Sequence, residues 1–199
     1  MPYRKLIMTM LALLSWPVIL GQEAWGQSDP PRVEVGAHLS YLRLEAVEPN
    51  LVLLRKSDDK GIGGRITLNI DRYLSIEVEA TFFPKDEVDR GNRLLALFGA
   101  KIGNHWDSVG LFVKIRPGLL RFENPTRVVA IGGCPGISQN NFALDIGGVL
   151  EFYPFRHFMV RFDAGDTIVS IDKQCPFPLT EKKAMTHNLQ VNAGIGFRF

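Results

Sequence analysis

The strongest constraint on the fold is an alternation of apolar and polar residues at period two in the segment NLQVNAGIGFRF, residues 188–199. One face of this segment carries Leu189, Val191, Ala193, Ile195, Phe197 and Phe199. The other face carries Gln190, Asn192, Gly194, Gly196 and Arg198. Because successive side chains of a strand point to opposite faces, the pattern predicts a strand with one apolar and one polar side.

Seven further segments alternate in the same way, and almost no segment has a helical period. They are residues 33–42, 61–70, 74–82, 95–103, 109–120, 142–152 and 158–165. The connections between the eight predicted strands are alternately long and short, which is typical of an antiparallel meander whose two ends face different environments. Pro117 removes a hydrogen-bond donor from its strand and predicts a β-bulge there.

The first 26 residues have the features of a signal peptide. Arg4 and Lys5 precede an apolar run from Leu6 to Leu20, and Ala24-Trp25-Gly26 supplies small residues for cleavage before Gln27. We therefore expect a cleaved signal peptide over 1–26 and one barrel domain over 27–199, with an uncleaved anchor as the alternative. The formal net charge of +2 gives no reason to expect a nucleic-acid partner.

Two cysteines, Cys134 and Cys175, lie in the predicted long loops 122–141 and 166–187. These loops leave the meander at the same end, and an exported chain meets an oxidising compartment, so we expect one disulfide. A catalytic cysteine is the alternative.

Charged residues on the polar faces balance, and this helps to decide which face points inward. Six are basic and six are acidic: Arg65, Lys101, Lys114, Arg116, Arg161, Arg198, Glu34, Glu77, Glu79, Asp145, Glu151 and Asp163. Equal numbers suit a closed network of ion pairs, because an unpaired buried charge costs several kcal/mol. The polar faces are also rich in glycine, which leaves room for long charged neighbours in a narrow lumen.

Aromatic residues gather near the ends of the predicted strands, as in the two interfacial girdles of a membrane barrel. Near the short turns these are Tyr73, Trp106, Phe152, Tyr153, Phe155, Phe158 and Phe199. Near the long loops they are Tyr41, Phe82, Phe83 and Phe142. A soluble barrel with an apolar interior is the alternative.

Lipid cannot satisfy the free edge of a sheet, so strands that cross a bilayer must close into a barrel. The sequence therefore predicts an all-β fold, a closed antiparallel eight-stranded transmembrane up-and-down β-barrel. The predicted signal peptide, the eight alternating strands and the terminal aromatic strand resemble small outer-membrane barrels of the OmpA/OmpX type. The resemblance implies a bacterial outer-membrane location, with outer-membrane lipids and lipopolysaccharide as neighbours. It also implies that the barrel-assembly machinery recognises an insertion signal made of Leu189, Val191, Ile195, Phe197 and Phe199.

No convincing catalytic constellation is present in the sequence. His38 and Ser40 share a strand face with Glu34, but side chains at i and i+2 lie about 7 Å apart, too far for a direct hydrogen bond. No metal-ligand spacing occurs, and no cofactor is expected. We expect no enzyme, but a barrel with a side-chain-filled lumen and a structural or surface-interaction role through long extracellular loops, whose ligand the sequence does not identify. A small passive pore and, as a weaker alternative, a lipid A-modifying enzyme remain open.

Overall fold

A computed structural model describes residues 31–45, 57–84, 92–122, 136–137, 140–174 and 183–199. Its strands are β1 (Val33–Leu44), β2 (Ser57–Asn69), β3 (Leu74–Phe83), β4 (Arg93–His105), β5 (Val109–Phe122), β6 (Gly136–Ile137), β7 (Asn140–Phe155), β8 (Phe158–Gln174) and β9 (Lys183–Arg198). Within these residues, no helix has the length and apolar character needed to span a membrane.

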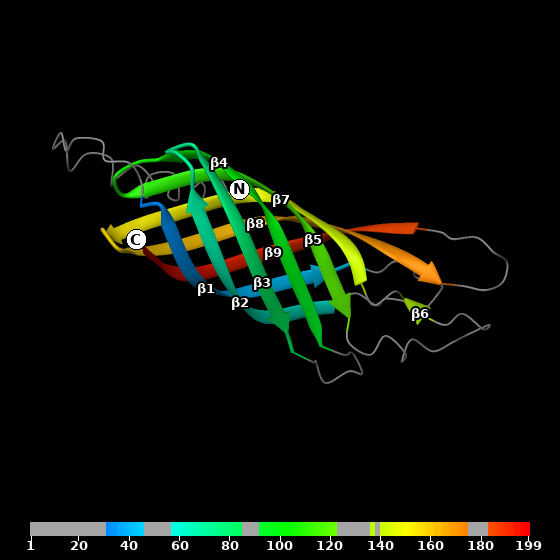
Figure 1. Ribbon diagram of the computed structural model, residues 1–199. Coiled ribbons are helices and arrows are strands. Elements are labelled where there is room, and N and C mark those ends of the chain that lie inside the picture. The colour runs from blue at the N-terminus through cyan, green and yellow to red at the C-terminus, as the bar shows by residue number, and fades with distance from the viewer. Residues whose placement is uncertain (1–30, 46–56, 85–91, 123–135, 138–139, 175–182) are drawn as a thin grey trace, which may run out of the picture.

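Eight of the strands form one closed antiparallel barrel (Figure 1). Each pairs with its neighbour in the order β8-β7-β5-β4-β3-β2-β1-β9, and pairing of β8 with β9 closes the ring. Closure brings Glu34 of β1 opposite Arg198 of β9, so the two ends of the described chain meet. The predicted fold class is confirmed. The short strand β6 pairs only with β8, outside the ring.

The barrel has a turn end and a loop end. At the turn end, residues 70–73, 106–108 and 156–157 join consecutive strands. Both termini of the barrel also lie there, where the backbone nitrogen of Phe199 donates a 2.8 Å hydrogen bond to the carbonyl oxygen of Val33. The loop end is the opposite rim, where most of the connecting residues lie outside the described ranges.

Strands β8 and β9 extend beyond the rest of the barrel at the loop end (Figure 1). Residues 166–174 and 183–187 were expected in a loop, and that prediction is wrong, because the β8–β9 ladder continues to Asp172 and Lys183. Thr167 and Val169 point inward, so the alternation of inward and outward side chains continues along β8 towards the loop end. The sheet formed by β8 and β9 therefore projects from the rim.

Pro117 causes no bulge, so that prediction is also wrong. Leu97 pairs with Gly118 and Ala100 with Ile115, which is one unbroken register with two pairs missing between them. On its other side Pro117 still pairs with Leu144. The missing donor therefore interrupts the β4–β5 ladder without inserting a residue.

Candidate functional site

The outer surface of the barrel carries a belt of exposed apolar side chains. Leu39 is 68% exposed, Val113 64% and Ile62 60%. Strand β5 presents apolar residues outward from Val109 to Leu119. At ~3.3 Å per residue and a tilt of ~40°, this stretch rises ~25 Å, which is the height of the apolar band on outer-membrane barrels.

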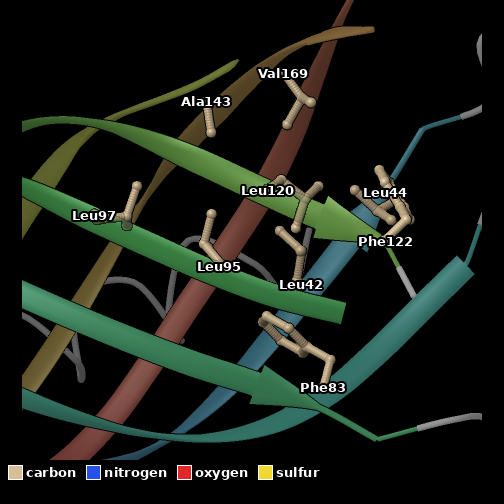
Figure 2. Packing of buried hydrophobic residues seen from close by; sticks show 9 residues of the cluster. All are labelled: Leu42, Leu44, Phe83, Leu95, Leu97, Leu120, Phe122, Ala143 and Val169. Carbon is tan, nitrogen blue, oxygen red and sulfur yellow. The ribbon is translucent and has the colours of Figure 1, made fainter. Parts of the chain in front are cut away.

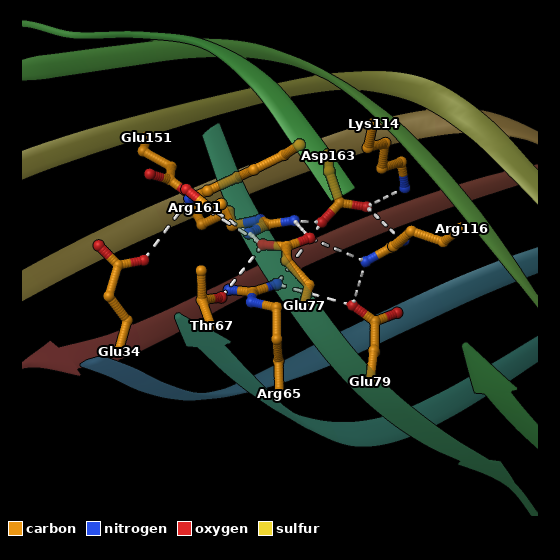
Figure 3. A network of polar contacts seen from close by, with 12 residues as sticks. Glu34, Arg65, Thr67, Glu77, Glu79, Lys114, Arg116, Glu151, Arg161 and Asp163 are labelled. Atoms are coloured by element: carbon orange, nitrogen blue, oxygen red, sulfur yellow. Dashed lines mark hydrogen bonds and ion pairs between the residues drawn. The ribbon is translucent and has the colours of Figure 1, made fainter. Parts of the chain in front are cut away.

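The interior holds all twelve charged residues that the sequence assigned to the lumen. Each is at most 7% exposed: Glu34, Arg65, Glu77, Glu79, Lys101, Lys114, Arg116, Asp145, Glu151, Arg161, Asp163 and Arg198. They come from all eight barrel strands and meet across the narrow lumen (Figure 3). Six acids and six bases leave this set without net charge.

Arg116 and Arg161 are the two hubs of the network (Figure 3). The guanidinium of Arg116 donates from Nη1 to Glu79 at 2.8 Å and from Nη2 to Asp145 at 2.6 Å. Arg161 donates to Glu77 from both terminal nitrogens, and its Nε reaches Asp163 at 3.2 Å. Such forked contacts fix the orientation of the carboxylates as well as their charge.

The two lumen lysines bridge further acids. The Nζ atom of Lys114 lies 2.9 Å from Asp145 and 2.7 Å from Asp163. The Nζ atom of Lys101 lies 2.6 Å from Glu151. The network therefore extends from the middle of the barrel towards the turn end.

Arg65 is the loosest member of the network. Its Nη1 atom lies 3.7 Å from Glu79 and 3.6 Å from Asp163, and its Nε and Nη2 atoms have no hydrogen-bond partner in the structure. Because a buried donor without a partner is costly, Arg65 is the position at which the network gives least stability.

Above the network, towards the loop end, the interior holds an apolar layer (Figure 2) and, at the same level, a buried ion pair of Arg93 and Asp59. This apolar layer comprises Leu42, Leu44, Phe83, Leu95, Leu97, Leu120, Phe122, Ala143 and Val169. The alternation predicts only charged, polar and small residues in the lumen, so this prediction is incomplete. The run LLALF at 94–98 carries the missed signal, since a strand apolar on both faces loses its alternation.

At the same level, the outer face of the barrel gains polar residues. Arg43, Lys60 and Arg121 point outward at the loop end, next to inward Leu42 and Leu120. On β1 and β5 near this rim, basic side chains therefore point outward and leucines point inward. The level at which the polarity reverses marks the upper edge of the apolar belt.

Two of the predicted girdle aromatics point into the lumen instead. Phe83 is 1% exposed and Tyr153 7% exposed, so their assignment to the girdles is wrong. Each directly follows an aromatic residue that points outward, because Phe82 is 40% exposed and Phe152 is 39% exposed. The hydroxyl of Tyr153 donates to Glu151 at 2.7 Å, which explains its inward position.

His38 and Ser40 both face the lumen but do not form a catalytic pair. The Nε2 atom of His38 is 2.9 Å from the hydroxyl of Thr81, and Ser40 accepts a 3.4 Å hydrogen bond from Gln190. Both residues are at most 4% exposed, so no lipid or polymer substrate reaches them.

The residues of the predicted insertion signal point outward, four of them on β9 and Phe199 directly after it. Their exposed fractions are 49% for Leu189, 39% for Val191, 51% for Ile195, 56% for Phe197 and 72% for Phe199. Cys134, Cys175 and the predicted signal peptide 1–26 lie outside the described residues.

The described residues include one cluster of potential metal ligands that no sequence spacing predicts. Glu34, His105 and Glu151 come from β1, β4 and β7, and their ligand atoms lie within 4.8 Å of one another. No local spacing could reveal this group, because its members are brought together only by closure of the barrel.

No protein-family model matches this sequence, and no curated protein is detectably similar to it. Solved structures do share its fold. The crystal structure of Neisserial surface protein A (NspA) has a TM-score of 0.51 at 19% identity, covering 84% of this chain and 97% of that one. The N-terminal β-barrel domain of Pseudomonas aeruginosa OprF has a TM-score of 0.52 at 15% identity, covering 86% and 100%.

A third similar structure is Ail, the attachment invasion locus protein of Yersinia pestis, with a TM-score of 0.53 at 13% identity, covering 85% of this chain and 99% of that one. The fold is thus that of the small eight-stranded barrels of the bacterial outer membrane, as the resemblance implied.

Proposed function

We propose that this chain, which has the fold of small outer-membrane β-barrels, resides in the bacterial outer membrane with a lumen closed by its own side chains, and that it acts through its loop end in a structural or surface-interaction role. The filling of the lumen carries the proposal. Twelve buried charged groups and the apolar layer above them occupy the space that a channel would need.

The reversal of polarity on the outer face supports the membrane placement. Below it, exposed apolar side chains would contact acyl chains; above it, Arg43, Lys60 and Arg121 would meet anionic headgroups such as the phosphates of lipopolysaccharide. The loop end then faces the outside of the cell and the turn end faces the periplasm, as in other outer-membrane barrels. The barrel-assembly machinery would insert such a chain.

The projecting strands β8 and β9 support a role at the cell surface. They carry ordered sheet beyond the rim, where Met185 is 71% exposed. Among the structures of the same fold, one is named a surface protein and another an attachment invasion locus protein. We propose a role of this class, interaction at the cell surface, for the present chain, with an extracellular ligand of unknown identity.

Conductance of the purified barrel in planar lipid bilayers tests the closed lumen against a small passive pore. We expect no stable open current in the wild-type protein. A variant that removes both hub arginines, Arg116→Ala with Arg161→Ala, is expected to give flickering current if it still inserts, because unpaired carboxylates would draw water into the lumen. Stable, large currents from the wild type would contradict the closed lumen and favour the pore.

The alternative of a lipid-modifying enzyme has one observation in its favour. On the outward face at the loop end, the Nδ1 atom of His187 lies 2.6 Å from Oδ2 of Asp166, and both side chains are exposed. A nucleophile is also required, and no described serine, threonine or cysteine hydrogen-bonds to the ring of His187. We therefore propose a non-enzymatic role; release of fatty acid from lipopolysaccharide by wild type but not by His187→Ala would contradict it.

A further inference from the structure

At the turn end of the lumen, one imidazole and two carboxylates converge. His105 lies at the end of β4, Glu34 near the start of β1, and Glu151 near the end of β7. One ligand atom from each lies within 4.8 Å of the other two, and none of the three residues is more than 8% exposed. This spacing would allow all three atoms to reach one ion at ordinary metal–ligand distances of ~2.0–2.2 Å after small side-chain adjustments.

The protein fixes the tautomer and the orientation of the His105 ring. Its Nδ1 atom lies 3.0 Å from the carbonyl oxygen of Arg72, which can only accept, so Nδ1 carries the proton. Phe112 packs edge-on against the ring, with centroids 4.7 Å apart. The Nε2 atom has no hydrogen-bond partner in the structure. A carbonyl that holds one ring nitrogen of a histidine while the other faces carboxylates is the arrangement of a metal ligand.

Both carboxylates are also held by neighbouring side chains, and Oε1 of Glu151 accepts a 3.1 Å hydrogen bond from Nη1 of Arg161. Arg198 donates from Nε to Oε1 of Glu34 at 3.0 Å, while Oε2 of Glu34 has no hydrogen-bond partner. Tyr153 donates its hydroxyl to Oε2 of Glu151 at 2.7 Å. All three potential ligands therefore already have the outer contacts that orient metal ligands.

Lys101 occupies the same region and competes for it. Its Nζ atom lies 2.6 Å from Oε1 of Glu151 and 3.5 Å from Oε2 of Glu34. The same atom lies 4.0 Å from Glu77 and 4.4 Å from the centroid of the Phe112 ring, which gives the ammonium other contacts if an ion displaces it. An incoming ion must therefore displace the Lys101 ammonium and compete with Arg161 for Oε1 of Glu151, which lowers the affinity of the site.

We propose that Glu34, His105 and Glu151 form a divalent transition-metal site at the periplasmic mouth of the barrel, with Lys101 as its built-in competitor. One nitrogen and two oxygen ligands suit borderline ions such as Zn²⁺ or Co²⁺. Ca²⁺ and Mg²⁺ prefer more oxygen ligands and no imidazole. The proposal does not depend on the surface role proposed above, since it concerns the opposite end of the molecule.

Titration of the folded, tag-free barrel with Co²⁺, followed by displacement with Zn²⁺, tests the site. We expect visible d–d absorption of bound Co²⁺ that Zn²⁺ abolishes. His105→Gln should remove this absorption, whereas His157→Gln, in the exposed turn, should leave it unchanged. Tyr153→Phe should weaken binding by about 10-fold to 100-fold, as the loss of an outer contact to a ligand commonly does.

A second variant, Lys101→Met, tests the site even if His105→Gln fails to fold. Removal of the competing ammonium should tighten Co²⁺ binding by at least about tenfold, which corresponds to the loss of roughly 1.4 kcal/mol of competition. Heat-modifiable migration on gels checks that each variant is folded. No binding to either wild type or Lys101→Met, or equal binding by wild type and folded His105→Gln, would overturn the proposal.

Discussion

Individual lumen residues are stabilised by being paired, not by being buried. Taking an ion out of water costs several kcal/mol even after relaxation, and only good geometry offsets that cost. Arg116 reaches that geometry with hydrogen bonds to Glu79 and Asp145, whereas Arg65 does not. Two arginines in the same lumen, Arg65 on β2 and Arg116 on β5, therefore contribute differently to stability.

We expect Arg116→Ala to lower the free energy of unfolding by about 3–5 kcal/mol, because it leaves Asp145 and Glu79 buried without their main partner. Arg121→Ala on the same strand is the matched control. Its side chain is exposed at the loop end, so its effect should stay within about 0.5 kcal/mol. Urea unfolding in phospholipid vesicles measures both, and equal effects would contradict a network that stabilises the barrel.

Residue types on the polar faces were predictable from sequence, but their partners were not. Alternation, together with the balance of charges on the polar faces, assigns Arg161 and Glu77 to the lumen. Their hydrogen bonds join strands β8 and β3, 84 residues apart in sequence, and depend on the tilt and closure of the barrel. For the same reason the cluster of Glu34, His105 and Glu151 had no sequence signal.

Among the elements, strands β7 and β8 approach each other closely through paired glycines. Gly147 of β7 lies directly opposite Gly165 of β8. A Cβ atom on Gly147 would lie 2.2 Å from the carbonyl oxygen of Ala164 and 2.6 Å from Cα of Gly165. These are backbone atoms that cannot move aside, so glycine is required by the neighbouring strand and not only by the long side chains in the lumen.

Gly147→Ala should therefore destabilise the barrel by about 1–3 kcal/mol, the usual cost of overpacking. The adjacent Gly148 is the control, since its nearest atom to an added Cβ, the carbonyl oxygen of Phe112, is 4.0 Å away. Gly148→Ala should be neutral or slightly stabilising, because alanine has less conformational freedom to lose. The temperature at which each variant loses its folded band on gels compares them; a larger loss for Gly148→Ala would refute the explanation.

Strand β9 closes the ring, and its outward residues include the predicted insertion signal. We expect Phe199→Ala to reduce the amount of protein inserted into the outer membrane while leaving the inserted barrel folded. Phe155→Ala is a matched control, because both aromatics are 72% exposed and both lie at the turn end. Quantification of each variant in outer-membrane fractions tests the role, and equal losses would show that the effect is simply one of lost apolar surface.

For the whole molecule, the fold was predictable because every barrel strand repeats the alternation of apolar and polar residues. The reversal of polarity near the rim was harder to recognise. The alternation continues there, but the apolar residues now point inward and the polar residues outward. In residues 40–44, SYLRL, inward Leu42 and Leu44 follow inward Ser40, and outward Arg43 follows outward Tyr41. If apolar residues are assigned to the outer face along the whole strand, the residues near the rim are assigned to the wrong face.

The disulfide between Cys134 and Cys175 stays a prediction about the loop end. We expect maleimide to label both residues only after reduction. A bond would constrain a loop of about 40 residues and stabilise the folded chain by roughly 4 kcal/mol in the chain-entropy account. Two thiols that react in the oxidised, folded protein would exclude it.

The central claim is that apolar side chains contact lipid below the reversal level while the rim stands in water. Spin labels attached to engineered cysteines at outward positions, in a background without Cys134 and Cys175, test it by their collisions with oxygen and with a water-soluble nickel complex. A label at Val113 is predicted to favour oxygen, and a label at Arg121 on the same strand to favour the nickel complex. Equal access of the nickel complex to both positions would contradict the account.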